Sequence, residues 1–215
     1  MQTIHDTKSA LEKQGADYLF KKISDLKKIK KQIIFGIVGG RSIAGILKNL
    51  SDLLPQENNL HIFMVDERWI AIDNKESNFY VVKESLKYGI FHPFDYKHDI
   101  AQYQKEFDNY GGTFDLVLLS AGEDGHVGSL FPNHDSIKST DKKFIKITNS
   151  PKPPLERIAA TKIMIQKAKG GLLVFFGPEK KGAYKNFNDP EITIDACPAK
   201  LFKEITRGLV LVTKD

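Results

Sequence analysis

The chain has 215 residues, of which 41% are hydrophobic and 27% are charged, as in an ordinary globular protein. This composition excludes a wholly disordered chain, and the length favours a single catalytic domain over residues 1–215. The formal net charge of +5 comes from lysines spread along the chain, and such a balance attracts anionic metabolites.

Cys197 is the only cysteine, so no internal disulfide can form. The start of the chain, MQTIHDTKSALEKQG, has no apolar run of the kind found in signal peptides. The sequence also lacks the stretch of about 18 apolar residues that a membrane span requires. These features predict a cytoplasmic protein without a membrane partner.

The first predicted element is a helix over Thr7–Lys30, whose second half is rich in lysine. Ile23, Leu26 and Ile29 stand at helical spacing among these lysines. We interpret the lysines as a solvated helix face. A nucleic-acid surface is disfavoured because no aromatic residues alternate with them to stack on bases.

A strand over Gln32–Val38 and a helix over Ser42–Leu53 follow, joined by Gly39-Gly40-Arg41-Ser42. Paired glycines let a ligand approach the backbone, and a helix amino end offers unpaired N–H groups, so the loop is a candidate phosphate site. Arg41 and the Ser42 hydroxyl would add hydrogen bonds. The alternative is a tight turn in which Ser42 caps the helix. The loop matches neither a P-loop nor a full dinucleotide fingerprint.

A strand over Leu60–Val65 leads into Asp66-Glu67-Arg68, and a helix over Ser77–Tyr88 follows. The three charges are consistent with a surface turn held by salt bridges. The functional alternative has Arg68 projecting into a cleft beside its acidic neighbours.

After a helix over His98–Tyr110 and a strand over Phe114–Leu119 comes Gly122-Glu123-Asp124-Gly125-His126. Histidine titrates near neutral pH, so an exposed histidine in a glycine-flanked loop is well placed as a general base. Asp124 or Glu123 would fix its tautomer.

A metal site built from Asp124, His126 and His134 is the alternative. Their spacing matches no known ligand pattern, so we predict neither a metal nor a cofactor. A nucleophilic serine also lacks support, because Ser120 and Ser129 do not stand in a G-x-S-x-G elbow.

The remaining predicted elements are strands over Lys143–Ile147, Leu172–Phe176 and Gly208–Thr213 and a helix over Pro178–Asn186. Two cations lie in this part of the chain. Arg157 follows the PKPP break, and Lys180 stands at the start of the last helix. Each is either a surface charge or a group that closes over an anion.

Strands that are apolar throughout alternate with helices, which predicts a three-layer αβα fold with a mostly parallel, Rossmann-like sheet. Ligands bind at the carboxyl ends of the strands in such sheets. Four predicted strands are followed there by glycines and charged side chains, so we expect these loops to form one site.

These motifs resemble those of the 6-phosphogluconolactonase family. The resemblance rests on the stretch from Phe114 through Gly122-Glu123-Asp124-Gly125-His126 to Ser129-Leu130-Phe131-Pro132, and on four shorter matches. The shorter matches are Gly39-Gly40-Arg41, Asp66-Glu67-Arg68 with Ser77-Asn78, PKPP with Arg157, and Gly177 with Lys180. They occur in family order over residues 33–201.

The resemblance implies a fold of the NagB/RpiA type and a metal-free hydrolase of the oxidative pentose phosphate pathway. It implies catalytic roles for His126, Asp124, Arg68 and Asp66. It implies that a phosphorylated sugar lactone is held by a second set of residues, namely Gly39, Gly40, Arg41, Ser42, Arg157 and Lys180. We expect a monomer or weak homodimer.

The chain departs from the family pattern at Val38, where a serine is usual, and at Ile43, where a proline is usual. The related glucosamine-6-phosphate deaminases are the alternative. They carry a glutamate where this chain has Phe131 and an aromatic residue where it has Arg68, and both differences favour the lactonase. A non-catalytic sugar-phosphate sensor on the same fold is a further alternative.

Overall fold

The computed structural model describes residues 1–56 and 59–214 and contains two sheets. The larger sheet has seven described strands in the order β1-β10-β9-β6-β2-β3-β5, and each neighbouring pair is parallel. The strands are β1 (Gln2–Asp6), β2 (Ile33–Ile37), β3 (Leu60–Met64), β5 (Ile90–His92), β6 (Leu116–Ser120), β9 (Gly171–Phe175) and β10 (Gly208–Thr213).

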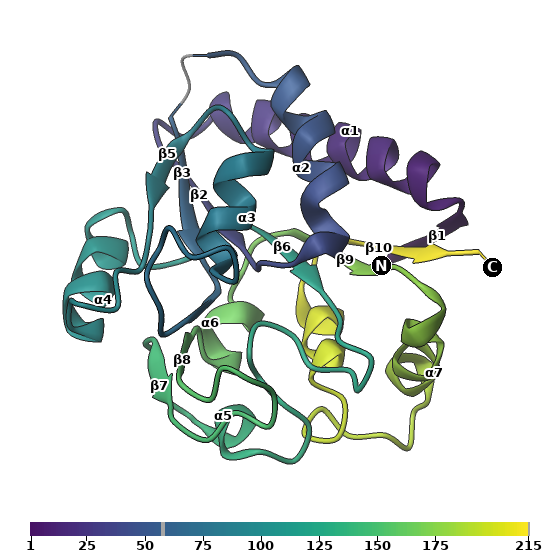
Figure 1. Cartoon of the computed structure of the whole chain (residues 1–215). Helices are drawn as coiled ribbons and strands as arrows, with labels where there is room; N and C mark the ends of the chain where they lie inside the picture. Colours follow the sequence, from purple (N-terminus) through teal and green to yellow (C-terminus); the bar gives the residue numbers. More distant parts are fainter. Residues whose placement is uncertain (57–58, 215) are drawn as a thin grey trace.

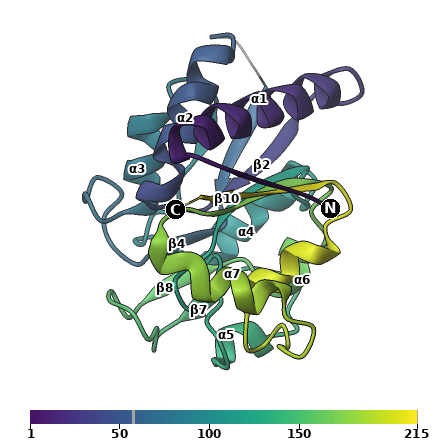
Figure 2. The ribbon, with the colours of Figure 1, turned by 90° about the vertical axis from the view of Figure 1, so that its right-hand side faces the viewer.

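Helices cover both faces of this sheet (Figures 1 and 2). One face carries α1 (Lys8–Lys27), α2 (Arg41–Leu53) and α3 (Asn78–Ser85). The other carries α4 (Ile100–Asn109), α6 (Lys162–Gln166), α7 (Lys181–Asn188) and the 3-10 helix η2 (Pro198–Glu204). The three-layer α/β prediction is confirmed. None of the described helices is both long enough and apolar enough to cross a membrane.

The central strands are buried along their whole length because helices cover both of their faces. Every residue of β2, β3 and β9 is buried. On the α2 side, Ile43, Ile46, Leu47 and Leu50 recur at helical spacing and are buried. Apolar runs without alternation in the sequence therefore mark the interior of the sheet.

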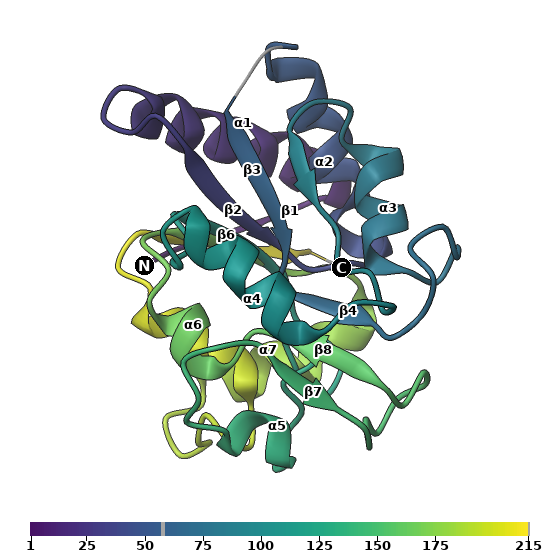
Figure 3. The same ribbon diagram turned by 90° about the vertical axis from the view of Figure 1, so that its left-hand side faces the viewer.

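The second sheet is small and antiparallel, in the order β4-β8-β7 (Figure 3). Its strands are β4 (Asp66–Arg68), β7 (Ile145–Ile147) and β8 (Arg157–Ala159). The strand predicted over residues 143–147 is present as β7, but it belongs to this small sheet and not to the parallel one. Lys146 is exposed between half-buried and buried isoleucines, a pattern typical of a strand with one face toward water.

Four strands fall outside the sequence prediction. β1 and β5 are the two edge strands of the parallel sheet: β1 is mostly exposed, and β5 is only three residues long, so neither shows a long apolar run. β4 and β8 carry the charged residues Asp66, Arg68 and Arg157, so their composition suggested loops. Two short elements, η1 (Pro178–Lys180) and α5 (Asp135–Lys138), complete the chain, and the predicted helix 178–186 is η1 followed by α7.

The chain order of the strands reverses between β2 and β6. From β2 the chain moves outward through β3 to β5, whereas from β6 it moves the other way through β9 to β10. Two neighbouring loops therefore leave the sheet in opposite directions, which opens a crevice at the strand ends. These loops are Gly39–Gly40 and Gly122–His126.

Candidate active site

The crevice contains a cavity of about 180 Å³ that gathers residues from five parts of the chain. Two predicted groups meet in it, the candidate base His126 and the cations Arg68, Arg157 and Lys180. The other lining residues are Val38, Gly39, Gly40, Ser42, Asp66, Asn78, Ser120, Ala121, Gly122, Gly128 and Ser129. The strand-end loops thus form one site, as expected from the parallel sheet.

His126 is held by the carboxylate two residues before it. Its Nδ1 lies 2.6 Å from Oδ1 of Asp124, and its backbone N–H donates to the same oxygen at 3.1 Å. Asp124 accepts at Nδ1, so the neutral ring carries its hydrogen there and leaves the Nε2 lone pair as a base. The ring also packs against Phe131, with 5.0 Å between centroids.

The pKa of Asp124 is shifted by opposing effects. Burial raises it, but hydrogen bonds from His126 and the positive charge of Lys152 outweigh burial and hold the pKa well below its ordinary value. Asp124 therefore stays ionised at neutral pH and is available to orient the imidazole.

The loop that carries His126 has a conformation that requires glycine. Gly125 has a φ of 87°, and a Cβ there would lie 2.8 Å from Sγ of Cys197. Its carbonyl accepts from Ala199 N–H at 2.8 Å, while Gly122 N–H donates to the His126 carbonyl at 2.8 Å. Contacts with Cys197 and with Ala199 of η2 therefore hold the loop in this conformation.

Asp66 lies inside the cavity and is hydrogen-bonded. Its Oδ2 accepts from the Ser129 hydroxyl at 2.5 Å, and the amide of Asn78 donates to its carbonyl at 2.9 Å. Ser129 is buried and has a φ of 59°, which is unusual for a residue other than glycine. Strained backbone of this kind occurs often in active sites.

Arg157 lines the cavity, but most of its N–H groups bind the protein. The guanidinium donates to the carbonyls of Lys152, Pro153 and Pro154 at 3.0–3.2 Å and to Ser129 Oγ at 3.2 Å. Burial lowers its pKa, and the nearby Asp66 charge opposes that effect. Much of the guanidinium therefore fixes the loop over residues 152–154, leaving few donors for a ligand.

Arg68 stands directly opposite Arg157 in the β4–β8 ribbon. Like charges placed opposite each other destabilise a strand pair, so this pairing favours a bound anion. One Arg68 N–H donates to the Glu76 carbonyl, and its buried Nε has no hydrogen-bond partner among the described residues. Buried donors without partners are rare in proteins, so this one marks a hydrogen-bonding group at the cavity wall that the described residues leave unused.

Glu67 points away from the cavity and supports its wall. Its buried carboxylate accepts from Ser77 Oγ and from three backbone N–H groups, two of them at the start of α3. Burial raises its pKa, although these four donors act in the opposite direction. Within Asp66-Glu67-Arg68, the outer two residues thus face the cavity and the middle one caps a helix.

The glycine loop places Gly39, Gly40 and Ser42 at the cavity, but not Arg41. Gly40 has a φ of 107° and precedes α2, which has no side-chain cap at its amino end. Arg41 is exposed and lines a neighbouring cavity of about 490 Å³ together with Lys75, Pro153 and Pro154. A phosphate contact by Arg41 stays a prediction.

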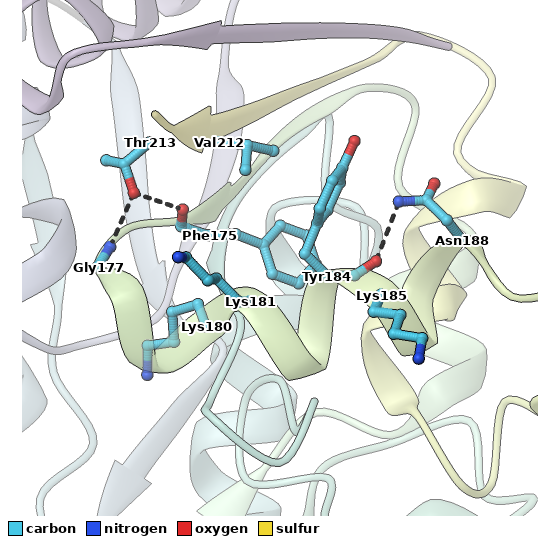
Figure 4. Close-up of a pocket in the computed structure, with 9 residues that line it drawn as sticks. All are labelled: Phe175, Gly177, Lys180, Lys181, Tyr184, Lys185, Asn188, Val212 and Thr213. Atoms are coloured by element: carbon cyan, nitrogen blue, oxygen red, sulfur yellow. Dashed lines mark hydrogen bonds between the residues drawn. The ribbon is translucent and has the colours of Figure 1, made fainter. Parts of the chain in front are cut away.

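Lys180 lies between the cavity and a second hollow of about 230 Å³ beside α7 (Figure 4). In Figure 4 its side chain points away from Tyr184 and the other residues of that hollow. The residues that line the hollow include no carboxylate and no imidazole. The imidazole of His126 and the carboxylate of Asp66 line the cavity on the other side of Lys180.

Ser129 and Asn78 line the cavity and bind Asp66, although the sequence predicts no site role for either. Both stand in the motifs that carry the family resemblance, and Ser129 lies three residues after the candidate base. His134, by contrast, caps α5 through Nδ1 and contacts the Asn149 carbonyl through Nε2. Among the described residues no three His, Cys, Asp or Glu side chains are grouped as metal ligands.

Comparisons with known proteins relate the whole chain to one family. Residues 6–211 match the family model described as glucosamine-6-phosphate isomerases/6-phosphogluconolactonase. The 6-phosphogluconolactonase of Borreliella burgdorferi is 34% identical over 196 residues, which cover 84% of this chain and 83% of the relative. That of Mycobacterium leprae is 29% identical over 177 residues, covering 72% of each chain.

Solved structures show the same fold. The 6-phosphogluconolactonase of Thermotoga maritima superimposes with a TM-score of 0.85 at 23% identity, covering 99% of this chain and 100% of its own. The Trypanosoma brucei enzyme gives a TM-score of 0.84 at 23% identity, covering 99% and 96%.

Proposed function

Because the chain belongs to the glucosamine-6-phosphate isomerase/6-phosphogluconolactonase family, we propose that it hydrolyses 6-phospho-D-glucono-1,5-lactone to 6-phosphogluconate. This reaction belongs to the oxidative pentose phosphate pathway. The observation that carries the proposal is the His126–Asp124 pair in a cavity lined by Arg68, Arg157 and Lys180.

In the proposed mechanism, His126 is the general base. Its Nε2 takes a proton from a water molecule while the water oxygen attacks the lactone carbonyl carbon. The carbonyl π electrons move to its oxygen, which becomes a tetrahedral oxyanion. When the carbonyl re-forms, the bond to the ring oxygen breaks, and protonated His126 gives its proton to that oxygen. Asp124 holds the ring in place throughout.

The oxyanion requires a donor that is already positioned, and Arg68 is our first candidate. Its buried Nε lacks a partner, and its neighbour Asp66 is bound to Ser129. A preorganised cation at this point stabilises charge that develops only in the transition state. A backbone N–H of the surrounding loops is the second candidate.

The phosphate is assigned to the other end of the cavity. The uncapped amino end of α2, the Ser42 hydroxyl and Lys180 provide N–H and O–H donors there, which suit an anion. Arg157 contributes to this group mainly through its charge, since most of its donors bind loop carbonyls. Binding the phosphate would orient the carbonyl without taking part in the reaction.

The alternative deaminase function is disfavoured by one contact. Phe131 is buried against the His126 ring, in the place where those enzymes carry a glutamate. An apolar ring there supplies no further acid or base for isomerising an amino sugar. A sugar-phosphate sensor would not require the His126–Asp124 pair. A cytoplasmic location and a monomer or weak homodimer stay predictions.

The test compares two substrates. Purified protein is mixed with freshly generated phosphogluconolactone and, separately, with glucosamine 6-phosphate, and acid and ammonia release are followed in a pH-stat and a coupled assay. The lactone hydrolyses unaided, so its rate without enzyme is subtracted. We expect acceleration of lactone hydrolysis alone. Ammonia release would support the deaminase, and binding without turnover would support a sensor.

A further inference from the structure

A lysine outside the cavity touches the residues that orient the base. Lys152 belongs to the PKPP segment, which connects β7 to β8. Its Nζ lies 3.0 Å from Oε1 of Glu123 and 3.5 Å from Oδ2 of Asp124. Two segments that are 29 residues apart in the chain, 152 and 123, are thus linked at the catalytic loop.

The two oxygens of Asp124 face different partners. Oδ1 accepts from the backbone and ring of His126, while Oδ2 faces the Lys152 ammonium. The carboxylate is therefore held from both sides. A change in the charge of Lys152 reaches the imidazole through this shared carboxylate.

The backbone of Lys152 is fixed, so its side chain extends from a defined point. Its carbonyl accepts from Arg157 at 3.1 Å and from the Ser150 hydroxyl at 2.8 Å. Its N–H donates to the same hydroxyl at 3.3 Å. The side chain is only partly exposed, and both of its ion pairs are made to the loop that carries His126.

Lys152 is not among the residues that line the cavity. A role in binding substrate is therefore disfavoured, and its contacts point to the base instead. We propose that Lys152 is a positioning residue: its ammonium holds the Asp124 carboxylate in place, and Asp124 in turn orients the His126 ring for its role as a base. This inference rests on the proposed hydrolysis.

The direction of the effect follows from the charges around His126. Lys152 and Glu123 act through Asp124, while the charges that line the cavity are Asp66, Arg68, Arg157 and Lys180. Removing the positive charge of Lys152 makes an imidazolium easier to form. The enzyme would then lose its base at a higher pH, and the acid limb of the pH–rate profile would move upward.

The experiment measures kcat and KM of the lactonase reaction from pH 5 to 9 for Lys152→Met. We expect the acid limb of kcat to move up by about half a pH unit, with KM changed less than about twofold. Lys152→Arg keeps the charge and should restore the wild-type profile. Lys146→Met is the matched control, because Lys146 also forms a salt bridge in the small sheet, to Glu156.

Glu123→Gln tests the direction in which the acid limb moves. It removes a negative charge and leaves Lys152 paired with Asp124 alone, so the acid limb should move to lower pH. An acid limb that is unchanged in both variants, or that moves the same way in both, would overturn the proposal. If the wild-type protein has no lactonase activity, the proposed function fails instead, and the two failures are thereby distinguished.

If Lys152→Met does not fold, as judged by circular dichroism, Glu123→Gln still decides the question. Its partner Glu123 is largely exposed, with a side chain 61% accessible, so this change should leave folding intact. A Lys152→Arg variant with a shifted acid limb would also contradict the proposal.

Discussion

The imidazole of His126 depends on a carboxylate only two residues away, and this closeness sets its tautomer. Asp124 accepts the Nδ1 hydrogen at 2.6 Å, so only Nε2 is left to accept a proton from water. A general base in such a position contributes about 10²–10⁴-fold to the rate. The proposed mechanism therefore depends on one ring atom, Nε2.

For His126→Ala we expect kcat for lactone hydrolysis to fall by about 10²–10⁴-fold while KM changes little, because the phosphate donors remain. Steady-state kinetics with the uncatalysed rate subtracted measure both constants. His98→Ala is the control, since His98 is exposed and far from the cavity lining. Near wild-type turnover in His126→Ala would show that another group is the base.

Lys180→Ala should raise KM more than it lowers kcat. A charge-assisted contact to the phosphate contributes about 1.5–3 kcal/mol, so KM should rise about 10- to 100-fold. Lys185→Ala, one turn along α7 and lining only the hollow of Figure 4, provides the comparison. A variant that loses kcat while keeping its KM would place Lys180 in the chemical step.

Single residues differed in how far their roles could be predicted from sequence. The placement of His126 and Asp124 in a loop at the end of a buried strand was predictable, because glycines flank the loop and an apolar strand precedes it; their catalytic roles stay predictions. The contacts of Arg157 were not, because they are made to backbone carbonyls that any sequence would supply. Arg41 stands in a loop that resembles a phosphate-binding loop, yet it lines the neighbouring cavity.

Among the elements, the catalytic loop combines two features that require glycine at position 125. The residue has a positive φ, and Cys197 fills the space where a Cβ would lie. Gly125→Ala should therefore destabilise the protein by about 1–3 kcal/mol and displace His126. Urea unfolding gives the free energy, and kcat reports the displacement.

The matched change is Gly182→Ala in α7, where nothing lies within 4 Å of the new Cβ. Alanine is the better helix former, so this variant should be more stable by about 0.5–1 kcal/mol. Equal effects of the two substitutions on stability would contradict the structural account of Gly125.

Strands that are buried in the core could be predicted from the sequence, whereas the short strands that line the cavity could not. β2, β3 and β9 are apolar throughout, so their sequences alone indicate central strands. β4 and β8 are three residues long and carry charges that face the cavity, so only pairing across the chain makes them strands. Long-range pairing of this kind leaves no local periodicity.

At the scale of the whole molecule, the parallel sheet and the small sheet supply different residues of the cavity. The reversal between β2 and β6 opens the crevice that holds the glycine loop and His126. The small sheet then brings Arg68 and Arg157 over this crevice, and its β7–β8 connection brings Lys152 (Figure 3). The fold class could be predicted from the alternation of elements, but the small sheet could not.

At the edge of the parallel sheet away from β1, three titratable side chains contact one another in a row: His61 of β3, His92 of β5 and Glu106 of α4. Nδ1 of His61 lies 2.9 Å from Nε2 of His92, whose Nδ1 lies 2.5 Å from Oε1 of Glu106. Both histidines are buried, and the His61 ring packs against the Tyr110 ring at a tilt of 37°, with 4.1 Å between the ring centroids. Burial, followed by the neighbouring His92, lowers the pKa of His61.

A lowered pKa means that the folded protein holds His61 neutral at a pH where an unfolded chain would protonate it. Histidine in an unfolded chain titrates near pH 6.5, so below about that pH the unfolded state binds the extra proton. The contribution of His61 to stability is fully present above pH 6.5 and decreases as the pH falls below it.

We therefore expect the free energy of unfolding in urea to be lower at pH 5.5 than at pH 8. In His61→Phe this pH dependence should weaken, whatever the variant's absolute stability, whereas His98→Asn should keep it because its histidine is exposed. A wild-type free energy of unfolding that is equal at both pH values would show that His61 is not held neutral by the fold.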